Sequence, residues 1–127
     1  MLESQLKKIT QGRDSVPVVF ISPDNIRYDK TIDGSVLKCL WNDISQDSNI
    51  PKMADIQGNR SNLYIDLFSL PSISEENENK IKIGKGWIVE GRPNSYKEIK
   101  AYTVSGVDPD NQLPALVIHL EQSELLL

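Results

Sequence analysis

Turn-forming residues divide this chain into short segments, and this division constrains the fold more than any other feature of the sequence. Six or seven of the segments are rich in β-branched and aromatic residues, or alternate between apolar and polar positions, as β-strands do. They are Val16–Ile21, Ser35–Trp41, Asn62–Phe68, Lys80–Gly84, Gly86–Gly91, Lys97–Val107 and Leu116–Leu120. No helical segments alternate with them, which argues against a parallel sheet built from β-α-β units. We therefore predict a mainly β fold, a small antiparallel β-barrel or sandwich.

The N-terminus differs from the rest of the chain. Leu2, Leu6 and Ile9 follow the spacing of one helical face, so residues 1–14 are expected to hold a short helix. A helix this short is marginal alone and has to dock on something. The full length of 127 residues suits a single domain, residues 1–127.

The remaining residues divide into a barrel and two irregular segments. We expect the barrel to occupy residues 15–121, followed by a C-terminal tail over residues 122–127. Residues 42–61 are dominated by Asn, Asp, Ser, Gln, Gly and Pro, and predict one long loop between strands. Loops of this length in compact domains are usually functional or disordered.

The composition excludes several classes of protein. One Cys cannot form an intrachain disulfide, and one Cys with one His cannot supply a four-ligand zinc site. The net charge of −4 argues against general binding of nucleic-acid phosphates. No apolar run approaches the roughly 18 residues of a membrane span, and the N-terminus lacks an apolar signal sequence. We therefore expect no metal, no cofactor and no membrane, and synthesis in the cytoplasm.

The sequence offers no arrangement typical of an active site. The only His, His119, alternates with the apolar residues of a strand and is expected on its other face. Cys39 shares a face with Leu37 and Trp41, so we expect it to be buried and to act as a small hydrophobe. The segment Gly84–Gly86 lacks the spacing of a phosphate-binding loop and predicts a tight turn with a Lys at its tip. We do not expect an enzyme.

Apolar side chains also occur on segments that a self-contained barrel does not need. They lie in the N-terminal helix, in the long loop and at the C-terminus. The candidate partner-contact residues are Leu2, Leu6, Ile9, Ile50, Met53, Ile56, Leu125, Leu126 and Leu127. Such groups either fold back on their own domain or wait for a partner. The sequence supports both interpretations, and the second predicts oligomerisation or docking.

The order of these elements resembles that of a known family over roughly residues 15–121. The resemblance is carried by Gly34–Asp43 before the long loop, Asn62–Leu67 after it, Lys80–Gly84, Trp87–Gly91, Tyr102–Val107 and Asp108–Asp110 before the last strand. This pattern is similar to that of the small head–tail joining, or head-closure, proteins of tailed bacteriophages, especially the lambda-type joining protein. Two features depart from it: Gly84–Trp87 stands where the family often has Gly-Asp, and Arg92–Glu98 is longer than expected.

The resemblance implies a structural protein of the virion, located at the head–tail junction. Such proteins complete the head by forming a ring at the portal, help retain the packaged DNA and offer a platform for the tail. The implied partners are other copies of the chain (a hexamer or dodecamer on the connector), portal and adaptor proteins above, and tail proteins below. Packaged DNA would pass nearby without specific binding, which agrees with the net charge of −4. The family's long loop, here residues 42–61, projects toward the DNA channel or a neighbouring subunit.

Two other functions remain open. One is a tail-terminator or tail-completion ring subunit, which can also be a small β-rich domain with a long loop. The other is an OB-like or SH3-like module that binds a peptide or single-stranded nucleic acid. Such a module needs exposed aromatic side chains with basic neighbours. Trp41 and Trp87 are the candidates, although Trp41 is expected in the core.

Overall fold

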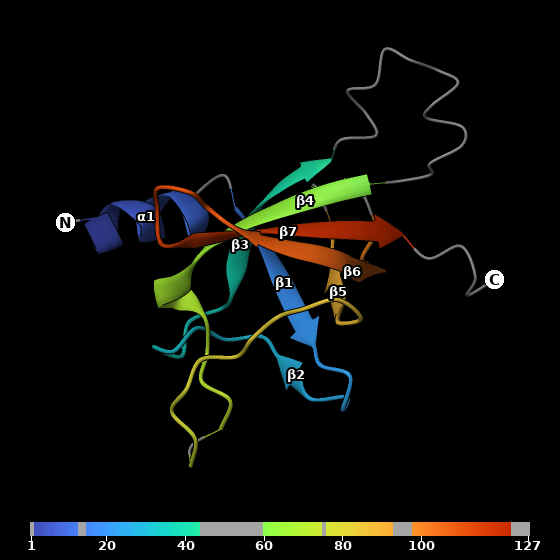
Figure 1. The fold of residues 1–127 in the computed structure, drawn as a ribbon, viewed down its shortest axis with the longest axis horizontal. Helices are drawn as coiled ribbons and strands as arrows, with labels where there is room; N and C mark the ends of the chain where they lie inside the picture. The colour runs from blue at the N-terminus through green and yellow to red at the C-terminus, as the bar shows by residue number, and fades with distance from the viewer. Residues whose placement is uncertain (1, 13–14, 44–59, 75, 93–97, 123–127) are drawn as a thin grey trace.

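A computed structural model describes residues 2–12, 15–43, 60–74, 76–92 and 98–122. Within these residues, one helix, seven strands and a 3₁₀ turn follow each other (Figure 1). They are α1 (Leu2–Thr10), β1 (Val16–Ile21), β2 (Arg27–Tyr28), β3 (Lys38–Asp43), β4 (Arg60–Asp66), η2 (Leu67–Ser69), β5 (Ile88–Gly91), β6 (Lys100–Pro109) and β7 (Ala115–Gln122). The prediction of a mainly β fold with a short N-terminal helix is confirmed.

The sheet closes into an antiparallel barrel of six strands. The strand order is β2-β1-β3-β4-β7-β6-β5, and an additional pairing of β1 with β5 joins the two sides. In this closing pair, Val18 lies opposite Gly91 and Ile21 lies opposite Ile88. β2 is a short addition to β1, with Phe20 opposite Tyr28. Closure leaves each of the six barrel strands paired on both sides, which removes the unpaired edges of an open sheet.

The core fills the inside of this barrel. Its buried members come from every barrel strand, from the residue just before β3 and from the segment between β4 and β5: Val18, Phe20, Leu37, Cys39, Leu63, Ile65, Leu70, Ile81, Ile83, Val89, Tyr102, Val104, Ile118 and Leu120. Strand residues of alternate parity point inward, as the period of two requires. The predicted burial of Cys39 with Leu37 is confirmed, and both side chains are inaccessible to solvent.

Trp41 completes the core at a close backbone approach. Its ring is partly buried and meets Tyr102 edge-on, with ring centroids 5.1 Å apart. A Cβ added at Gly91 would lie 2.7 Å from Trp41 Cζ3. Only a residue without a side chain therefore lets β5 pass this ring without displacing it.

Three strand predictions need correction. Lys80–Gly84 does not form a strand: Lys80 makes an isolated bridge with Ser72, and Ile81 N donates to Pro71 O at 3.0 Å. The strand predicted over Asn62–Phe68 ends at Asp66, because the chain turns there into η2. As the last strand of the chain, Leu116–Leu120 is expected to close the sheet, but it belongs to β7, which lies between β4 and β6.

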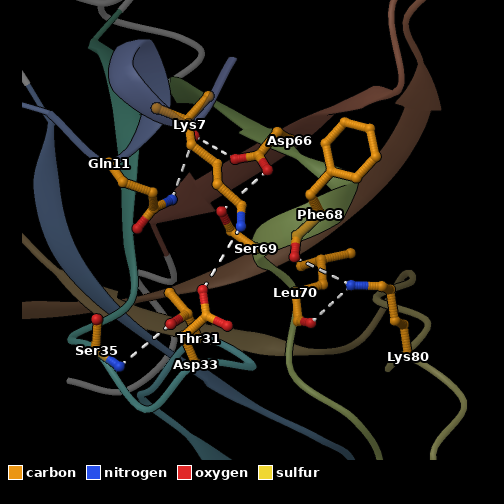
Figure 2. Close-up of polar contacts among 11 residues, drawn as sticks. Lys7, Gln11, Thr31, Asp33, Ser35, Asp66, Phe68, Ser69, Leu70 and Lys80 are labelled. Atoms are coloured by element: carbon orange, nitrogen blue, oxygen red, sulfur yellow. Dashed lines mark hydrogen bonds and ion pairs between the residues drawn. The ribbon is translucent and has the colours of Figure 1, made fainter. Parts of the chain in front are cut away.

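A buried carboxylate holds α1 to the barrel. Asp66 is the last residue of β4, and its side chain is fully buried. Thr10, the last residue of α1, donates a hydrogen bond to Asp66 Oδ1, and Ser69 Oγ donates to Asp66 Oδ2 at 2.9 Å. Figure 2 shows the contact between Asp66 and Ser69 beneath the helix. Because a buried polar group is costly unless it is hydrogen-bonded, this cluster fixes where α1 ends on the barrel.

Gln11 extends this attachment to β3. Its side-chain Oε1 accepts from Lys38 N at 2.9 Å, while its Nε2 donates to Lys38 O at 2.5 Å. The amide group thus satisfies both backbone groups of the first residue of β3, as a neighbouring strand would. Lys7 adds an ion pair with Asp33, with Nζ and Oδ2 3.5 Å apart (Figure 2).

We predict that Thr10→Val lowers the free energy of unfolding by about 1–3 kcal/mol, because it removes one hydrogen bond to a buried carboxylate without changing the side-chain volume much. Urea denaturation followed by circular dichroism measures the change. Thr103→Val on β6, whose Thr103 is only partly buried, is the matched control and should change stability by less than about 0.5 kcal/mol. Equal effects of the two substitutions would contradict the assigned role of the cluster.

Candidate partner-binding surfaces

The two residues that resemble catalytic groups have structural surroundings. Cys39 lies in the core, and burial raises the pKa of its thiol far above the ordinary value. A thiol that stays protonated is a poor nucleophile. Within the part of the chain that the structure describes, no three His, Cys, Asp or Glu side chains are placed to hold a metal ion.

His119 lies on the outer face of the barrel, as predicted, and links three strands. Its Nδ1 is 2.9 Å from Asn62 Oδ1 of β4, and its Nε2 is 2.8 Å from Asp108 Oδ2 of β6. Both ring nitrogens therefore already face side-chain oxygens. Gly106 lies opposite His119 at an irregularity in the β6–β7 pairing, and a Cβ at Gly106 would lie 3.9 Å from His119 Cδ2, an ordinary van der Waals contact.

A second polar contact continues this outer row. Tyr64 Oη donates to Asp110 Oδ2 at 2.9 Å, and Asp110 Oδ1 accepts from the backbone N–H groups of Gln112 and Leu113. These two backbone hydrogen bonds, and then the one from Tyr64, lower the pKa of Asp110. Burial, followed by the hydrogen bond with Asp110, raises the pKa of Tyr64. The arrangement ties the β6–β7 connection to β4.

The turn predicted at Gly84–Gly86 is confirmed. Trp87 N donates to Gly84 O at 3.2 Å, and Gly86 has a φ of 96°, a conformation that favours glycine. Lys85 at its tip is exposed. Trp87 itself stacks on Tyr28, with ring centroids 5.9 Å apart and an interplanar angle of 26°.

The predicted partner-contact residues fall into three groups. Leu2 and Ile9 are 43% and 52% exposed on α1. Leu6 was expected at a partner surface, but it is only 3% exposed, because α1 turns this part of its apolar face onto the barrel. The remaining candidates, Ile50, Met53, Ile56, Leu125, Leu126 and Leu127, lie outside the described residues, as does most of the predicted loop 42–61.

The structure adds a groove beside β1 that sequence reasoning missed. This β1 groove has a volume of about 420 Å³. Its apolar lining includes Pro17, Val19, Val36 and Ile99, of which Val36 is 51% and Ile99 65% exposed. Arg27 and Glu90 form an ion pair at its side. The alternation of side chains along the chain was the available signal in the sequence. Because Leu37 and Cys39 point inward, Val36 is expected to point outward.

A second hollow lies at the end of the barrel where β4 and β6 finish and β7 begins. This barrel-end pocket has a volume of about 820 Å³. Its apolar lining comprises Leu67, Leu70, Ile73, Ile81, Ile83, Val107 and Leu116. Lys80 and Lys82 contribute the charge. Figure 2 shows the Lys80 ammonium held between the carbonyls of Phe68 and Leu70, at 3.1 and 3.3 Å.

Comparisons of the chain with known protein families, with curated proteins and with solved structures found no match. The single described helix, nine residues of α1, is too short to cross a membrane.

We predict that Tyr64→Phe returns the pKa of Asp110 part of the way toward its ordinary value, because the substitution removes a hydrogen bond to the charged form. A carboxyl whose pKa is lower in the folded than in the unfolded state stabilises the fold at pH values above its unfolded-state pKa. This stabilisation is lost as the pH falls through the folded-state pKa. Carbon-detected NMR titration of the side-chain carboxyl measures the shift. An unchanged titration midpoint for Asp110 would contradict this account.

Proposed function

We propose that this protein is a structural assembly protein that forms a ring by head-to-tail contacts, and that the ring joins the head of a tailed bacteriophage to its tail. The observation that carries the assembly role is the pair of separate apolar hollows, the β1 groove and the barrel-end pocket. The resemblance of residues 15–121 to head–tail joining proteins supports the proposed location. A tail-terminator ring would use the same surfaces.

The two hollows lie toward opposite ends of β6. Ile99, just before this strand, lines the β1 groove, whereas Val107 near its end lines the barrel-end pocket. The eight residue steps between them correspond to about 26 Å of strand. A head-to-tail contact requires two different patches on each subunit, and copies joined this way form a closed ring when the rotation between them closes.

Exposed apolar side chains supply a reason for association. Val36 and Ile99 are each more than half exposed in the same groove, and Leu2 and Ile9 project from α1. Contiguous apolar surface with polar neighbours is typical of protein-binding sites. The ion pair of Arg27 with Glu90 and the nearby Asp29 and Lys30 give the β1 groove a mixed charged border, as interface rims usually have.

The charge supports a ring through which DNA passes. The chain carries a net charge of −4, which lowers its affinity for phosphates. Nucleic-acid binding through aromatic stacking is less well supported, because Trp41 packs on the core and Trp87 stacks on Tyr28. A binding module for single-stranded nucleic acid would present such rings to the bases.

We predict that Val36→Asp combined with Ile99→Asp weakens self-association about tenfold or more, because burying two carboxylates in an apolar contact costs more than the roughly 1.4 kcal/mol that a tenfold change represents. Sedimentation velocity over a concentration series measures the association. Ile32→Asp is the matched control, since Ile32 is 49% exposed but does not line the groove. Association that survives the double substitution would exclude the β1 groove as an interface.

The joining role has its own test. Deletion of the gene from the phage that encodes it should produce DNA-filled heads and separate tails, visible by negative-stain electron microscopy. Supplying the wild-type protein should restore tailed particles, and the Val36→Asp, Ile99→Asp variant should restore few. Normal tailed particles in the deletion would overturn the joining role.

A further inference from the structure

The lining of the barrel-end pocket selects a ligand by its charge as well as its apolar character. Among the described residues that line it, the charged ones are Lys80 and Lys82, and none is acidic. Lys82 is exposed, whereas the Lys80 ammonium donates hydrogen bonds to the carbonyls of Phe68 and Leu70. The pocket therefore suits a segment that combines apolar side chains with negative charge.

The C-terminal part of this chain has that composition. β7 ends at Gln122, and the sequence continues as Ser123, Glu124 and three consecutive leucines. Glu121, near the end of β7, is exposed and adds a second negative charge. Three leucines next to two carboxylates complement a pocket lined by leucines, isoleucines and two lysines.

A segment attached to the same barrel falls short of the part of the pocket that Leu116 forms. Leu116 lines the pocket near the start of β7, six residue steps before Gln122 at the end of the strand, or about 20 Å away. Ser123–Leu127 can span at most about 17 Å when fully extended, and it would have to reverse direction first. The leucines at 125 and 126 reach less far still. The pocket of one copy is therefore matched to the tail of another.

We propose that residues Glu124–Leu127 of one copy insert into the barrel-end pocket of the next copy, with the leucines against the apolar wall and Glu124 near Lys82. The inference rests on the proposed ring and specifies its head-to-tail contact. The β1 groove is a poorer match for this segment, because its border carries Glu90 and Asp29 as well as basic residues. Such an exchange leaves the β1 groove for a second contact.

A peptide tests the pocket apart from ring formation. The probe is a fluorescein-labelled peptide of residues 121–127 with an amidated end, and the protein is the full chain with Leu125→Ser, Leu126→Ser and Leu127→Ser, which vacates the pocket. We expect saturable binding by fluorescence anisotropy, with NMR shifts of the methyl groups of Ile73, Ile81 and Leu116. A peptide of the same composition in scrambled order is the control. Equal binding of both peptides, or shifts confined to other surfaces, would overturn the proposal.

A charge exchange tests the pairing of Glu124 with Lys82. Lys82→Glu should weaken binding of the native peptide about fivefold or more, and a peptide carrying Glu124→Lys should recover most of that loss on the Lys82→Glu protein. Lys85→Glu is the matched control, because Lys85 is exposed on the nearby turn and lies outside the pocket lining. Weakening without recovery by the exchanged peptide would contradict the pairing.

The outcome for the full chain separates this inference from the proposed function. If the triple Leu→Ser variant forms rings as the wild type does, the tail exchange is wrong and the ring stands. If the wild-type chain stays monomeric at every concentration and on its connector, the ring is wrong whatever the peptide shows. Loss of rings in the triple variant, together with specific peptide binding, supports both.

Discussion

The pairing of β1 with β5 is the interaction on which the rest of the structure depends. It converts a strip of strands into a closed barrel and encloses the core residues between its walls. It also leaves the barrel strands without long free edges, so a partner cannot simply add a strand to the sheet. A proposed partner would then contact side chains in hollows and on added segments, where Val36, Ile99, Leu2 and Ile9 are exposed.

The attachment of α1 follows a different physical rule. Leu6 supplies an apolar contact, but Asp66 fixes the position, because a fully buried carboxylate has to find hydrogen-bond donors. Thr10 from the helix and Ser69 from η2 supply them. Gln11 then takes the place of a neighbouring strand at the first residue of β3. The helix is thereby a fixed part of the surface that carries Leu2 and Ile9.

The sequence predicted the barrel because its strands have an inward face, and a period of two is visible in residues such as Leu63 and Ile65. The same period gave a wrong prediction at Lys80–Gly84. Ile81 and Ile83 also alternate and are buried in the barrel, but they belong to a segment that is not a strand and whose backbone is hydrogen-bonded to Pro71. Pattern alone cannot distinguish a strand from an extended segment that is held by other means.

The candidate surfaces were predictable only in part. The apolar stripe of α1 was visible, but whether Leu6 meets its own barrel or a partner depends on tertiary packing, which periodicity does not report. The β1 groove combines Val36 and Ile99, which are far apart in the sequence and come together only through the closing pair. The pocket lining of Leu67, Ile81 and Leu116 likewise depends on chain reversals that no local signal specifies.

The long separation of β1 and β5 in the sequence also determines when their pairing can form during folding. Val19 pairs with Glu90, so most of the chain has to be made and collapsed before this contact can form. Contacts between residues so distant in sequence slow folding, because the entropy of closing the loop is lost before the contact is gained. The β1 groove is built from both of these strands and exists only after they meet. In the proposed ring, a subunit would therefore present this surface to a neighbour only when its own barrel is complete, which would keep unfinished copies out of the growing assembly.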